Sequence, residues 1–98
     1  MAKSNHVISI EVTSTVLGEE FIIAKVKEFV TTTLQEEWTH YVVKKMIITV
    51  DKDTFIKING TDLVKVKAGT TEFKYSDPDI ESVTAESTGS NVHAIVFF

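Results

Sequence analysis

The sequence contains no cysteine, no arginine, one proline and four glycines. Without cysteine the chain cannot form a disulfide, a thiolate zinc site or a cysteine nucleophile. All ten basic residues are lysines, and the net charge is -4 at pH 7. Arginine is the usual bidentate reader of guanine, so its absence from an acidic chain predicts that the protein does not bind nucleic acid.

Long apolar runs are also missing. No stretch approaches the roughly 18 apolar residues that span a bilayer, and residues 1–6 lack the apolar region of a signal peptide. We therefore expect that the protein does not associate with a membrane and that it folds in a cytoplasm. The length of 98 residues, with 43% hydrophobic and 24% charged residues, is typical of a globular chain, so residues 1–98 are expected to form a single domain.

Short segments of alternating apolar and polar residues dominate what is present, with turns between them every 7 to 12 residues or so. The expected strands are residues 7–12, 38–43, 46–50, 55–58, 63–67, 70–75, 80–85 and 92–98. Asn59-Gly60 is the strongest hairpin signal, because both residues tolerate the positive φ of a type I′ turn. The pattern predicts a mainly β protein with an antiparallel β-sandwich or jelly-roll-like fold.

Residues 19–34 fit two structures. In a helix, Ile22, Val26 and Val30 would share one face. In strands, Ile22 and Val26 would alternate with lysines, and the β-branched run at residues 31–33 disfavours a helix. We favour a short helix or irregular turn near residues 18–28, followed by a strand around residues 28–34.

No group of residues points to catalysis or to metal binding. His6, His40 and His93 are far apart and fit no metal-ligand spacing, and no serine lies in a nucleophile motif. The acid pairs Asp51/Asp53 and Asp77/Asp79 do not match a calcium loop and are typical of turns. We expect no catalytic, cofactor-binding or metal-binding residues, and we do not expect an enzyme.

Two segments are apolar on both faces of the expected strand, namely Met46–Val50 and His93–Phe98. Such a strand needs cover on both sides. Either these are central strands of a closed sandwich, or one face contacts another subunit.

The order of segments over residues 38–98 resembles small β modules of bacteriophage virion proteins, such as head-fibre, decoration, and neck or tail accessory proteins. The residues that carry the resemblance are Trp38–Tyr41, Met46–Asp53, Phe55–Asp62, Lys67–Thr70 and Ile80–Val83. The resemblance implies no catalytic residues. It implies oligomeric attachment to a particle, and hence a location in the virion after synthesis in the host cytoplasm.

Three functions follow as hypotheses. The first is a structural or assembly component of a bacteriophage particle that works through contacts with its own copies and with other virion proteins. The second is a module that binds a glycan or receptor, with Trp38, Tyr41 and Tyr75 stacking on a sugar. The third is an inhibitor that docks on a host protein by adding an edge strand.

Overall fold

The computed structural model describes residues 6–13, 17–60, 62–75 and 79–98. Within them, seven strands form two antiparallel sheets, in the orders β1-β7-β2-β5 and β4-β3-β6. The strands of the first sheet are β1 Val7–Thr13, β7 Asn91–Phe97, β2 Lys45–Val50 and β5 Gly69–Lys74. The strands of the second are β4 Asp62–Val66, β3 Thr54–Ile58 and β6 Val83–Ala85.

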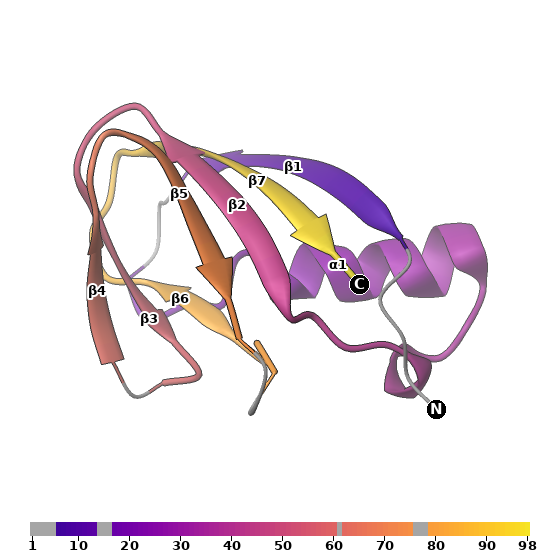
Figure 1. The fold of residues 1–98 in the computed structure, drawn as a ribbon. Coiled ribbons are helices and arrows are strands. Elements are labelled where there is room, and N and C mark those ends of the chain that lie inside the picture. The colour runs from indigo at the N-terminus through magenta and orange to yellow at the C-terminus, as the bar shows by residue number, and fades with distance from the viewer. Residues whose placement is uncertain (1–5, 14–16, 61, 76–78) are drawn as a thin grey trace.

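The four-stranded sheet makes one layer of the molecule, and a mixed layer covers its inner face. In Figure 1, the helix α1 (Ile23–Phe29) lies beneath β1 and β7, while the three-stranded sheet lies beneath β2 and β5. The expected mainly β, sandwich-like fold with one short helix near residues 18–28 is therefore confirmed. The sandwich is asymmetric, because a helix fills part of its second layer.

The strand expected around residues 28–34 is wrong. There α1 continues into a π-helical segment, η1 (Val30–Leu34). Two hydroxyl groups of the threonine run bond back to the helical main chain: Thr31 donates to the Lys27 carbonyl at 3.0 Å and Thr32 to the Glu28 carbonyl at 2.7 Å. Val26 and Val30 are fully buried on one face of the helical segment, so packing decides the structure there.

The strand expected over residues 38–43 is also wrong. Trp38–His40 form a short 3-10 helix, η2, and residues 41–44 continue without regular pairing. The strand expected over residues 80–85 shortens to β6, since residues 80–82 are irregular. The β3–β4 hairpin has the expected turn, with φ of 57° at Asn59 and 71° at Gly60.

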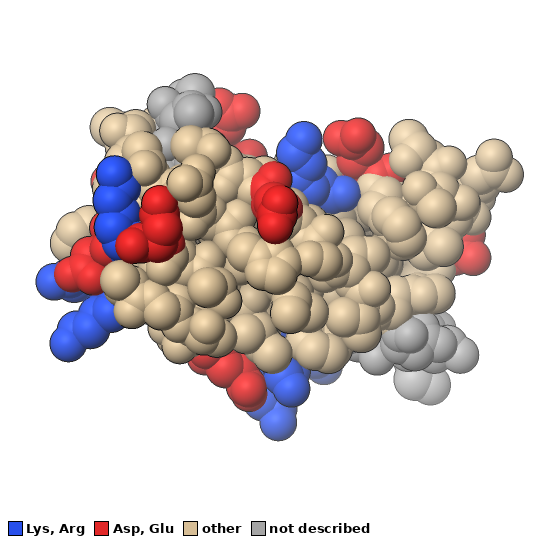
Figure 2. Space-filling model, turned by 90° about the horizontal axis from the view of Figure 1, so that it is seen from above, with Lys and Arg blue, Asp and Glu red and all other residues tan. Residues whose placement is uncertain are grey.

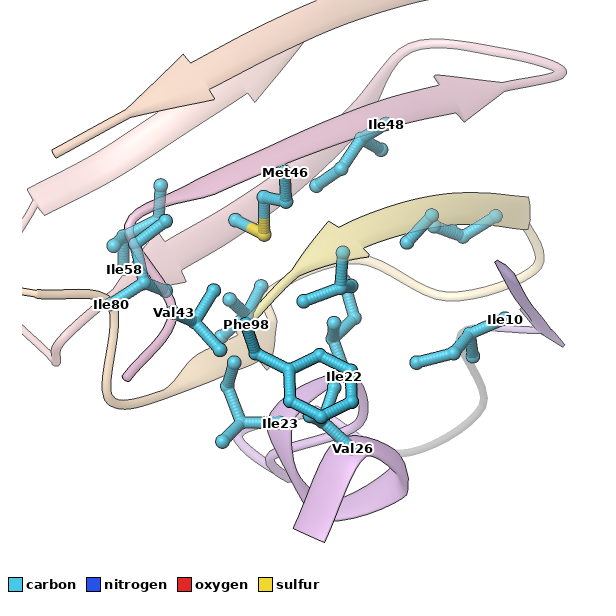
Figure 3. Packing of buried hydrophobic residues seen from close by; sticks show 14 of the residues in the cluster. Ile10, Ile22, Ile23, Val26, Val43, Met46, Ile48, Ile58, Ile80 and Phe98 are labelled. Atoms are coloured by element: carbon cyan, nitrogen blue, oxygen red, sulfur yellow. The ribbon is translucent and has the colours of Figure 1, made fainter. Parts of the chain in front are cut away.

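The core lies between the two layers and runs the length of the molecule. Phe98 is fully buried and follows β7 directly. Figure 3 shows its ring above α1, near Ile23 and Val26, while Met46 and Ile48 extend from β2 into the same core. Burial of one such side chain contributes about 1.5 to 3 kcal/mol.

Candidate functional site

Strand register defines the outer face of the four-stranded sheet. Residues that alternate with the buried ones point to this face, and the pairing places them in rows across the strands. The rows are Val7-Phe97-Lys45-Lys74, Ser9-Ile95-Ile47-Glu72 and Glu11-His93-Thr49-Thr70, with Thr13-Asn91 at the end. No segment of the described chain lies over these rows (Figure 1).

An apolar band crosses two of these rows. Ile47 and Ile95 are direct cross-strand neighbours and are half-buried, and Val7 is 57% exposed at the edge. The Lys45 ammonium lies 4.8 Å from the centre of the Phe97 ring, a cation–π contact. Figure 2 shows the face from above: uncharged residues cover most of it, although an acidic side chain stands near its middle.

Outside the apolar band, several polar side chains of the outer face hydrogen-bond to one another across the strands. Ser9 Oγ lies 2.5 Å from His93 Nε2, and Thr49 Oγ1 lies 2.9 Å from Thr70 Oγ1. Thr13 donates to the Asn91 side chain at 3.1 Å. Such pairs stabilise the sheet across strands. The face as a whole therefore offers a flat apolar band beside a hydrogen-bonded polar region.

The histidines do not form a common site. His93 lies on the outer face, whereas the His6 ring lies 5.4 Å from both the Tyr41 and the Phe98 ring. The main chain of His6 also pairs with that of Phe98. His40 belongs to η2 and does not share a strand with Trp38. Among the described residues, no three potential ligands cluster around a metal position.

The first acid pair lies in the turn between β2 and β3, but its carboxylates bond residues far away in the sequence and not the turn itself. Asp51 accepts hydrogen bonds from the main-chain and side-chain amides of Asn91, at 2.9 and 3.1 Å. Asp53 accepts from the Ala68 amide at 2.9 Å and lies 3.4 Å from the Lys65 ammonium. The Ala68 hydrogen bond, followed by Lys65, lowers the pKa of the Asp53 carboxyl. Of the second pair, Asp77 lies outside the described residues.

The aromatic residues considered for sugar stacking pack inward instead. Tyr41 is 9% exposed, and its ring makes an edge contact with Phe98 at 5.6 Å between centres. Trp38 is half-buried, stacked on Tyr41 at 6.4 Å and tilted against Phe98. The Tyr41 hydroxyl donates to the Glu36 carboxylate, and this bond raises the pKa of the Tyr41 phenol above 10.0. These two rings close the end of the core. Tyr75 is half-buried and also packs against the core, so none of the three is fully exposed.

The protein has an asymmetric, β-sandwich-like fold, and no described segment covers the outer face of its four-stranded sheet. No protein-family model matches the chain, and no curated protein or solved structure matches it either. In the described part of the chain, the helical segments are too short or too polar to cross a membrane.

Proposed function

We propose that this protein is a structural subunit of a larger protein assembly, and that it works through contacts between chains. The observation that carries the proposal is the outer face of the four-stranded sheet. Ile47, Ile95 and Phe97 stand there on the central strands β2 and β7, on the face where the strands of a sandwich usually carry polar residues. Protein interfaces commonly join such an apolar centre to a polar rim.

The bacteriophage particle is the setting that we propose for this assembly. Support for it comes from the resemblance of residues 38–98 to small β modules of virion proteins. In that setting the outer face would contact a neighbouring virion protein. Stacked sheets pack about 10 Å apart through flat faces of this kind.

The proposal predicts that a charge in the apolar band prevents incorporation into particles. Ile95→Lys places an ammonium in the centre of the outer face, where burial against a partner would leave it unpaired. We expect the unmodified chain to co-sediment with intact particles from producing cells. The amount of the Ile95→Lys variant in the particles should be at least tenfold lower, which corresponds to about 1.4 kcal/mol of contact energy. The measurement is the ratio of this chain to the most abundant particle protein by quantitative mass spectrometry.

Leu63→Lys is the matched control. Leu63 is 60% exposed on β4, in the other sheet, so the same charge change there leaves the outer face intact. Its level in particles should equal that of the unmodified chain. If the unmodified chain stays in the supernatant, or if both variants are incorporated equally, the proposed role of the outer face is wrong.

A further inference from the structure

The outward edge of β1 is a second unpartnered feature, distinct from the outer face. β1 is the first strand of the four-stranded sheet and pairs only with β7. His6 and Phe98 exchange main-chain hydrogen bonds in both directions. Because such pairs alternate along an antiparallel ladder, this shows which residues of β1 bond to β7. Ile8, Ile10 and Val12 therefore bond to β7. The amides and carbonyls of Val7, Ser9, Glu11 and Thr13 point away from the sheet, and none of them pairs with a described residue.

Within the part of the chain that the structure describes, the other edges of the two sheets are protected, and that of β1 is not. β5 carries Glu72 and Lys74, and β4 carries Lys65. β6 is three residues long, and residues 18–21 pair with its outer side through hydrogen bonds of 2.6 to 3.2 Å. β1 has seven residues; it carries one acid, Glu11, but no lysine, no proline and no bulge in its register. Edges of this kind are the ones that accept another strand.

A groove runs along the free edge of β1, between this strand and α1. At one end it is lined by residues 7–11 together with Lys25 and Phe29, and at the other by Val12, Thr13 and residues on both sides of Lys25. Ile8 and Val12 are half-buried although they point to the inner face, because the groove leaves them partly open. An added strand would cover them and at the same time pair with the free main-chain groups.

We propose that this edge pairs with β1 of a second copy of the chain, in antiparallel orientation about a two-fold axis at Ile10. The contact refines the proposed function by naming the first partner. The sequence Val-Ile-Ser-Ile-Glu-Val-Thr supports it, because the apolar residues Ile8 and Val12 stand symmetrically about Ile10. With full overlap, Val7 lies opposite Thr13 of the second copy and Ser9 opposite Glu11 of the second copy. Each such pair exchanges two main-chain hydrogen bonds.

Side chains on both faces of this joint are compatible with self-pairing. On the inner face, Ile8 meets Val12 of the second copy and the two Ile10 residues meet each other, so the two cores join through apolar contacts. On the outer face, Glu11 lies directly opposite Ser9 of the second copy, and the two Glu11 side chains are diagonal neighbours about 7–8 Å apart. Below the strands, the two α1 helices run antiparallel. Lys25 and Glu28 are both exposed there, one turn apart, so Lys25 can reach Glu28 of the second copy. The product is a continuous eight-stranded sheet with a twofold larger outer face.

Amide hydrogen exchange on the unmodified chain tests the pairing directly. At concentrations where light scattering gives about twice the 10.9 kDa of one chain, the amides of Val7, Ser9, Glu11 and Thr13 should all be protected. Dilution to the monomer should speed the exchange of these four amides at least tenfold. This factor corresponds to a decrease of about 1.4 kcal/mol in the free energy of opening. The amides of Ile8, Ile10 and Val12 should change little, since they bond to β7 in both states.

A pair of variants at Glu11 gives an independent readout. Glu11→Pro removes one outward amide and no bond to β7, and proline is tolerated at an edge strand in this orientation. Glu11→Thr removes the charge but keeps the amide. We expect Glu11→Pro to be monomeric at concentrations where Glu11→Thr remains dimeric. If Glu11→Pro does not fold, the exchange pattern of the unmodified chain still decides the question.

Two results would overturn self-pairing. One is a monomer at all concentrations with four fast-exchanging amides on the edge of β1. The other is a dimer in which those amides remain fast and Ile95→Lys, instead of Glu11→Pro, dissociates the chains. The second result leaves the outer face as the contact surface, so the proposed function can stand when the β1 joint fails.

Discussion

At the scale of single residues, the alternation along the last strand separates core from surface. The sequence places Phe98 with Val92, Ala94 and Val96 on one face, and Phe97 on the other. The structure bears this out, with Phe98 fully buried and Phe97 half-buried beneath Lys45. Alternation cannot say which face is the core. That depends on the residues from η2 and α1 that surround the Phe98 ring, and these lie far away in the sequence.

Asp53 gives the residue-scale prediction. Its carboxylate accepts a hydrogen bond from the Ala68 amide and contacts Lys65, and both lower its pKa below the usual 3.8. A group with a lowered pKa in the folded state stabilises the fold above its unfolded pKa, and this stabilisation is lost as pH falls through the folded pKa. Unfolding by urea from neutral pH to well below 3.8 measures it. In Asp53→Asn the loss of stability with falling pH should be smaller than in the unmodified chain, and an identical pH profile would contradict this role.

At the scale of elements, α1 is stabilised from outside its own sequence. The Glu20 carboxylate accepts hydrogen bonds from the amides of Ile23 and Ala24 at the start of the helix, at 2.9 and 2.5 Å. It also accepts from the amide of Val83 on β6 at 2.8 Å. One side chain therefore joins the helix to the second sheet. An acidic residue before a helix is a recognisable sequence signal, but the bond to Val83 bridges distant residues and has no local signal.

Glu20→Ala should therefore destabilise the fold by about 2 kcal/mol, because it leaves amides at the helix start and on β6 without an acceptor. Glu19→Ala is the matched control. The Glu19 side chain is exposed, and its replacement should change stability by no more than about 0.5 kcal/mol. Urea unfolding followed by circular dichroism measures both. Equal effects of the two substitutions would show that Glu20 does not cap the helix.

The threonine run in η1 shows where local propensity fails at this scale. Three β-branched residues in succession predict a strand, and the structure has a helical segment. The residues at the neighbouring buried positions decide the outcome, since Ile22, Ile23, Val26 and Val30 fill the space beneath β1 and β7. The three threonines are exposed, so their strand preference acts on side chains that pack against nothing.

At the scale of the whole molecule, the sequence predicts most strands, the hairpin at Asn59-Gly60 and the β-sandwich class. It does not predict the strand order, because β1 and β7 come from opposite ends of the described chain and pair through non-local contacts. The candidate contact surface is predictable in part. The two-sided apolar strands identify Ile47, Ile95 and Phe97, whereas the free edge of β1 follows only from the strand order.

The central claim at this scale is that the protein works as one of several chains in contact. The most direct test is the mass of the purified, unmodified chain by light scattering over a wide concentration range. We expect a mass that rises with concentration from 10.9 kDa to at least twice that value. A mass of 10.9 kDa at every concentration, together with the absence of the chain from purified particles, would contradict it.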